Sequence, residues 1–163
     1  MSARIERIMK AYPEMVMERN CLAHQIAHFK GVTAAEVISS MYTPRVDGDR
    51  VQSSGTSDKT AQIALTYQDR VDQINREWFE HLETRMRELT EEMRFFESTL
   101  HALSCRLSSI MWDMVVNQMT CDAVEKKYFL SHTSLYRQRQ KAISEMERMY
   151  SRHEEEMSQF LLQ

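Results

Sequence analysis

The residues of this chain that could do the most specific chemistry are five bases in a segment without acids: Lys126, Lys127, Arg137, Arg139 and Lys141. From residue 126 to residue 152 the sequence holds seven bases and two acids, a net charge of +5, although the whole chain has a net charge of −3. Arg can bridge a guanine edge with two hydrogen bonds, and basic side chains can hold phosphates. The same bases would also suit the solvated face of an ordinary surface helix, so charge alone leaves both readings open.

A helix that begins after Ser131 would place its apolar residues on one face and its polar and basic residues on another. Its apolar positions would form an inward stripe made of Leu135, Ala142, Met146 and Met149. In a helix-turn-helix, the N-terminal part of the second helix enters the major groove. Candidates for base contacts are the residues that face away from Leu135, namely His132, Thr133, Tyr136, Arg137, Gln140 and Lys141. Candidates for phosphate contacts are Ser134, Arg139, Lys126 and Lys127.

A metal site was considered at Cys21, His24 and His28, which lie roughly on one face of one helix. Two histidines one helical turn apart can bind zinc. However, Gln25 stands where a zinc protease helix needs a glutamate as general base, and no further ligand lies nearby in the sequence. We therefore expect packing or surface histidines here, with no metal and no cofactor.

Other features of the sequence argue against an enzyme, a secreted protein and a membrane protein. It contains no phosphate-binding loop, no nucleophile elbow and no pair of acids with a reason to be buried. Three cysteines, far apart and without paired spacing, are typical of reduced thiols in a cytosolic protein. The N-terminus has no apolar segment behind its charges, and no apolar run is long enough for a bilayer.

The elements that would position these residues are helices. Three glycines, two prolines and thirteen methionines among 163 residues favour a nearly all-α protein. Apolar residues recur every three or four positions from Tyr67 to Met114, which predicts a long helical stripe typical of a coiled-coil arm. Weak helix formers predict a break in this stripe between Glu97 and Ser104.

The sequence divides into five parts. Residues 1–42 form an N-terminal helical unit, with a first helix from Ala3 to Ala11, an interruption at Pro13, and a second helix to about Lys30. A capping box at Thr33 predicts a short helix from Ala34 to about Met41. Residues 43–57 are a linker whose Ser57 would cap the long helix of residues 58–98. A three-helix unit follows at residues 99–153, and residues 154–163 are an acidic and apolar tail of the last helix.

The three-helix unit has local signals for a helix-turn-helix. Its first helix would run to about Asn117, and Thr120 would cap the second. Ser131 would cap the third helix. The segment "TCDAVEKKYFLSHTSLYRQRQKAISEM" resembles the C-terminal helix-turn-helix, region 4, of sigma-70-type factors. The match falls on Thr120, Val124, Tyr128, Leu130, Ser131, Leu135, Lys141, Ala142 and Ile143.

A wider resemblance covers residues 51–150. The segment "VQSSGTSDKTAQIAL" before a long helix is similar to phage late-gene regulators of the ArpU and RinA kind, in which a helical arm precedes a sigma-like helix-turn-helix. This resemblance implies binding to double-stranded DNA, contact with RNA polymerase, and a place in the cytoplasm of a bacterial host. Two residues depart from the family pattern: Phe129 replaces a glycine of the turn, and Glu125 replaces a small residue of the second helix.

Two hypotheses follow from the sequence. The first is a sequence-specific transcriptional regulator of phage or prophage late genes. It would act as a homodimer and would not bind a membrane. The second is a helical adaptor or scaffold that binds proteins and uses no DNA, as the long stripe and the methionine content would also suit.

Overall fold

The structure is a computed structural model that describes residues 3–42 and 56–162, with side chains described for residues 4–40 and 66–162. The predicted linker falls largely on residues 43–55, which lie outside the described residues. The described residues form six helices and their connections, without a strand, so the all-α prediction is confirmed. The chain divides into two compact units, residues 1–21 with 87–163, and residues 22–86.

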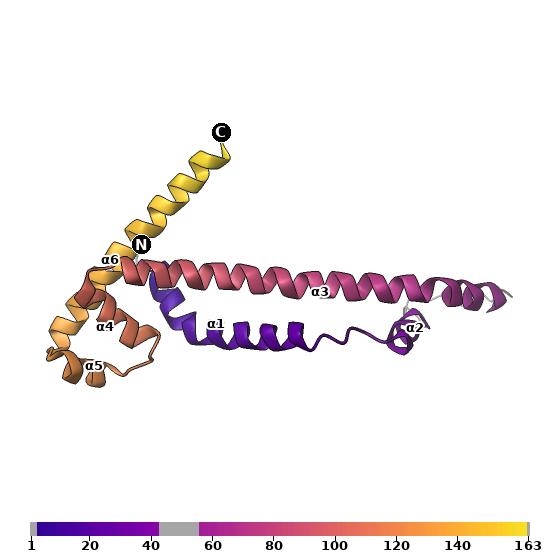
Figure 1. The fold of residues 1–163 in the computed structure, drawn as a ribbon, viewed down its shortest axis with the longest axis horizontal. Coiled ribbons are helices and arrows are strands. Elements are labelled where there is room, and N and C mark those ends of the chain that lie inside the picture. Colours follow the sequence, from indigo (N-terminus) through magenta and orange to yellow (C-terminus); the bar gives the residue numbers. More distant parts are fainter. Residues whose placement is uncertain (1–2, 43–55, 163) are drawn as a thin grey trace, which may run out of the picture. The chain divides into compact units, whose positions relative to one another are not determined.

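The first helix, α1, runs from Ala3 to Ala27 without interruption, so the prediction of two helices that meet at Pro13 was wrong. A proline inside a helix removes one backbone hydrogen bond. Here the residues on both sides of it are held by packing, because Met9, Tyr12 and Met15 are all buried. Tyr12 also donates a hydrogen bond of 2.6 Å to Oε1 of Glu97. The proline is accommodated in a helix that Figure 1 shows bent in its N-terminal half.

The end of α1 is followed by a turn that Asn75 fixes in the second unit. The helix ends at Ala27, before the predicted Lys30, and Gly31 adopts a φ of 68°. The Asn75 side chain accepts a hydrogen bond from the Val32 amide (2.6 Å) and donates one to the Val32 carbonyl (3.3 Å). A Cβ on residue 31 would collide with the Asn75 side chain, which its two hydrogen bonds to Val32 hold in place, so both the backbone angle and the space favour glycine.

Helix α2 spans Ala34–Tyr42 and begins with the predicted capping box. The Thr33 amide donates to Oε2 of Glu36 over 2.8 Å, and the Glu36 amide donates to Thr33 Oγ1 over 3.4 Å. The hydrogen bonds from the Thr33 amide and hydroxyl to the carboxylate lower the pKa of Glu36.

Helix α3 is the longest element, from Thr56 to Ala102 (Figure 1). Its 47 residues correspond to roughly 70 Å of helix at 1.5 Å per residue. It begins one residue before the predicted cap, Ser57. It ends within the predicted interval, because Leu103 and Ser104 separate it from α4. Its buried apolar residues are Val71, Leu82, Leu89, Met93, Phe96 and Leu100.

The last three helices pack against one another as a small bundle. They are α4 (Cys105–Val115), α5 (Cys121–Tyr128) and α6 (His132–Leu161). Ile110, Val124 and Leu135 come from the three helices in turn and form one buried cluster. The predicted inward stripe of α6 is largely confirmed, since Leu135, Ala142 and Met146 are buried and Met149 is half-buried. Helix α6 then continues to Leu161, and every residue from 151 to 162 is exposed.

Candidate nucleic-acid interface

Two side-chain caps define the pair of helices α5 and α6. Thr120 has extended backbone angles, and its Oγ1 accepts a hydrogen bond of 3.3 Å from the Ala123 amide. Ser131 plays the same part for α6, since its Oγ accepts from the Ser134 amide over 3.3 Å. Both caps satisfy amides that a helix start leaves without a partner, and both were predicted from the sequence.

The turn between α5 and α6 has a left-handed residue that is not glycine. Phe129 adopts φ 52° and ψ 48°, and its side chain is 94% exposed. The Phe129 and Leu130 amides both donate to the Glu125 carbonyl, over 2.9 Å in the case of Leu130. These bonds close the end of α5 as a C-terminal glycine motif would. The chain therefore makes a left-handed turn with a bulky residue at position 129.

Exchange of Phe129 for Gly is expected to stabilise the protein by about 0.5–1 kcal/mol, because a non-glycine residue in this conformation costs about 1–2 kcal/mol. The exposed ring contributes little packing that could be lost. Phe129→Val serves as the opposite case, because a β-branched residue is less tolerant of positive φ and should destabilise the protein. Chemical denaturation of the three proteins would measure the differences, and a less stable glycine variant would contradict this account.

Glu125, the second departure from the family pattern, contacts the first residue of α6. Its Oε1 lies 2.8 Å from Nδ1 of His132, and the Glu125 side chain is 21% exposed. The two residues are seven positions apart in sequence, so the contact spans the turn. Glu125 therefore joins α5 to α6 by a polar contact.

A buried acid that the sequence interpretation missed anchors α5 to α4. Asp113 of α4 is only 4% exposed. Its Oδ2 accepts hydrogen bonds of 2.6 Å from Lys127 Nζ and from the Tyr128 hydroxyl, and its Oδ1 accepts one of 2.8 Å from Asn117. The only sequence signal for this site was an acid on an otherwise apolar helix face, four residues before an amide side chain.

The titration behaviour of the Asp113 cluster follows from these contacts. Burial raises the pKa of Asp113, but the hydrogen bonds from Lys127, Tyr128 and Asn117 outweigh it, so the pKa lies below its ordinary value. Burial and the hydrogen bond to Asp113 raise the pKa of Tyr128 to about 12. At neutral pH the carboxylate is therefore ionised and the phenol is protonated, the forms that make these hydrogen bonds.

The ten residues predicted from the sequence fall into two groups in the structure. Five of them contact other residues of the chain: Lys127 with Asp113, His132 with Glu125, Ser134 with Ser131, Arg139 with Glu6 at 3.5 Å, and Lys141 with Glu145 at 3.9 Å. The other five have no hydrogen bond or ion pair among the described residues, namely Lys126, Thr133, Tyr136, Arg137 and Gln140.

The second group supplies most of the exposed surface of the motif. Tyr136 is 57% exposed, Lys126, Thr133 and Arg137 are exposed, and Gln140 is half-buried. Tyr136 and Arg137 project from the second turn of α6, and Thr133 precedes them by one turn. Because Leu135 is 3% exposed and fixes the rotation of α6, these side chains share a surface that α4 and α5 leave uncovered.

Arg139 is oriented differently from the prediction. Its side chain is 23% exposed and its guanidinium lies 3.5 Å from the Glu6 carboxylate of α1, so it joins α6 to α1. Lys127 is likewise committed in part to Asp113, although half of its side chain remains accessible. These two bases therefore have structural contacts that their sequence positions did not reveal.

Other kinds of site were sought on the rest of the described chain. No group of three or more His, Cys, Asp or Glu side chains that could hold a metal ion occurs among the described residues. His24 and His28 have ring centroids 4.4 Å apart, and Cys21 is exposed. No helix of the described residues is long and apolar enough to cross a bilayer. Comparisons of the chain with protein-family models, curated proteins and solved structures gave no match.

Proposed function

We propose that this protein is a sequence-specific DNA-binding transcriptional regulator that reads the major groove with the first turns of α6. The observation that carries the proposal is the capped pair α5 and α6, whose uncovered surface holds Thr133, Tyr136 and Arg137. A short helix, a tight turn and a longer helix with polar residues in its first turns are what this mode of reading requires.

The two groups of residues would have different roles on DNA. Arg137 is the best candidate for a base contact, because it is exposed, is free of an ion pair among the described side chains, and can bond a guanine bidentately. Lys126 lies near the C-terminal end of α5 and would hold a phosphate. Arg139 is a weaker candidate for a phosphate contact, because a phosphate would compete with the Glu6 carboxylate 3.5 Å from its Nη1.

A role in phage or prophage late transcription is part of the proposal, and it rests on the resemblance to sigma region 4 and to the ArpU and RinA regulators. Under it, the protein acts in the cytoplasm of a bacterial host and contacts RNA polymerase through surfaces other than the first turns of α6. The chain has only this one sigma-like segment, so it would regulate a promoter and not melt it.

The test is selection of a binding sequence from random duplexes, followed by fluorescence anisotropy with the selected duplex and a scrambled one. We expect the selected duplex to bind at least about 1,000-fold more tightly at physiological salt. The logarithm of affinity should fall linearly with the logarithm of salt concentration, with a slope of about −0.9 for each phosphate contact. Equal affinity for the two duplexes would exclude sequence-specific recognition.

A second candidate function is that of a helical adaptor without DNA. The observation that favours it is the exposed apolar end of α6, where Phe160 is 72% and Leu161 is 75% exposed. Surfaces of this kind commonly bind other proteins. The two functions are separated by the first turns of α6, because charge reversal there would abolish DNA binding and leave an adaptor's contacts intact.

A further inference from the structure

The C-terminal end of α6 carries an apolar stripe that its own chain leaves uncovered. Met146, Tyr150, His153, Met157 and Phe160 follow one another at intervals of four and three residues, so they share one face of the helix. The first two are buried, and the His153 ring lies 4.4 Å from that of Phe95. Beyond Arg152 every residue to 162 is exposed, including Met157 and Phe160 of the stripe.

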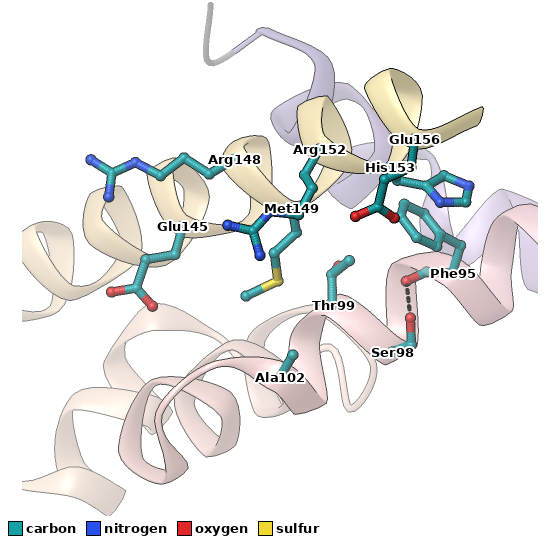
Figure 2. Close-up of a pocket in the computed structure, with 10 residues that line it drawn as sticks. All are labelled: Phe95, Ser98, Thr99, Ala102, Glu145, Arg148, Met149, Arg152, His153 and Glu156. Carbon is teal, nitrogen blue, oxygen red and sulfur yellow. Dashed lines mark hydrogen bonds between the residues drawn. The ribbon is translucent and has the colours of Figure 1, made fainter. Parts of the chain in front are cut away.

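A groove in the same unit has the shape and chemistry to receive such a stripe. It lies between α3 and α6 and has a volume of about 490 Å³. Figure 2 shows Thr99 and Ala102 of α3 pointing toward α6, while Met149 and Arg152 extend back from α6 toward α3. An apolar cavity of about 150 Å³ can hold a benzene ring, so the groove has room for two or three apolar side chains.

Unpaired charges of opposite sign lie in the groove and on the tail. Arg148 and Arg152 line the groove and belong to no ion pair among the described side chains. The lining also contains two acids, Glu145, which pairs with Lys141 at 3.9 Å, and Glu156, which belongs to the tail itself. Of the three consecutive acids of the tail, Glu154 pairs with Arg4, whereas Glu155 and Glu156 have no ion pair among the described side chains. These carboxylates would repel a phosphate backbone, which argues against nucleic acid as the occupant. A segment that is acidic and apolar, as the tail itself is, fits the groove.

We infer that the chain forms a two-fold dimer in which the C-terminal end of each α6 lies in the α3–α6 groove of a second copy. Tail and groove lie on the same chain, so a single two-fold axis satisfies both copies at once. With the two helices antiparallel and Arg152 level with Glu156 of the second copy, Phe160 comes level with the groove beside Met149. The exposed part of the stripe, Met157 and Phe160, is then buried in the dimer.

The inference is tested by sedimentation equilibrium of the full chain without DNA. We expect the mass of two chains for the natural sequence and the mass of one chain for Phe160→Glu with Leu161→Glu. Met17→Glu is the matched control, because Met17 is also an exposed apolar residue (68%) on a helix, but lies on α1. It should leave the dimer unchanged. A monomeric natural chain, or a dimer that the tail variant does not weaken, would overturn the inference.

The antiparallel register has its own test by charge exchange. Arg152→Glu alone and Glu156→Arg alone should each weaken the dimer by about tenfold or more, because each places like charges together twice across the axis. A mixture of the two variants should form a heterodimer with the affinity of the natural dimer, since both contacts are again between opposite charges. An ion pair within one helix could not produce this recovery, so a mixture that stays monomeric would exclude the register.

These tests are independent of the proposed function. A natural chain that is monomeric and still binds DNA sequence-specifically would overturn only the tail-in-groove interface. A dimer with the expected behaviour and no affinity for a selected duplex would overturn only the DNA-binding role.

Discussion

Exchange of Arg137 for Glu is expected to weaken binding to the selected duplex by about 100-fold or more. Loss of one bidentate base contact costs about 1–3 kcal/mol, equivalent to roughly 5- to 150-fold, and the new carboxylate would add repulsion from the phosphates. Arg137 is exposed and has no ion pair among the described residues, so the change should leave folding stability nearly constant. Anisotropy titration with the selected and scrambled duplexes measures the effect.

Specific and general electrostatic effects can be separated with two further variants. Arg94→Glu makes the same charge change at an exposed position of α3 outside the α4–α6 bundle, and it should alter affinity by only a few-fold through net charge. Lys126→Glu should weaken the selected and scrambled duplexes about equally, as loss of a phosphate contact does. If Arg137→Glu and Arg94→Glu had equal effects, Arg137 would not be a base-reading residue.

The distinction between Arg137 and Arg139 shows what sequence reasoning could reach in this site. Both lie on α6 two residues apart, and both were predicted to face DNA. The rotation of α6 was predictable, because Leu135, Ala142 and Met146 recur at helical spacing and are buried. The partner of Arg139 was not, because Glu6 lies 133 residues away on α1 and no local pattern links the two.

In the rest of the fold, too, features that depend on neighbouring residues were predictable, and features that depend on tertiary packing were not. The caps at Thr33, Thr120 and Ser131 were predictable, since each depends on residues within three positions. The continuity of α1 through Pro13 was not, because proline disfavours a helix interior and only tertiary packing reverses that preference. A bulky residue at position 129 predicted a reshaped turn, but Phe129 keeps the left-handed conformation, and its ring meets no steric obstacle because it is 94% exposed.

Replacement of Asp113 by Ala is expected to destabilise the bundle by about 2–3 kcal/mol. Hydrogen bonds to a charged group contribute about 1.5–3 kcal/mol, and removal of the carboxylate leaves the Tyr128 hydroxyl and Lys127 without their acceptor. Urea denaturation followed by helical signal measures the change. Asp122→Ala is the matched control, an exposed aspartate on α5, and should cost less than about 1 kcal/mol.

A double-mutant cycle shows whether the contact with Tyr128 carries this effect. Tyr128→Phe alone should destabilise the protein by about 1 kcal/mol, and the same change made in the Asp113→Ala background should cost less, because the acceptor is already gone. If the two substitutions had additive effects on the unfolding free energy, the hydrogen bond between the Tyr128 hydroxyl and the Asp113 carboxylate would not stabilise the bundle.

The Asp113 cluster should also determine how stability depends on pH. Because the pKa of Asp113 is lower in the folded chain than in the unfolded chain, its contribution to the unfolding free energy is fully present above the ordinary aspartate pKa of about 3.9 and is lost as pH falls through the folded value.

Tyr128 affects stability at alkaline pH. Its pKa is raised to about 12, so its contribution is present below its ordinary value of 10.0 and is lost as pH rises through about 12. Asp113→Asn should therefore flatten the acid side of the stability profile. Tyr128→Phe should reduce the alkaline dependence in part, because burial also raises the pKa values of Tyr12 and Tyr150 to about 12. Unfolding free energies measured across this range that kept the natural profile in both variants would show that other groups govern the titration.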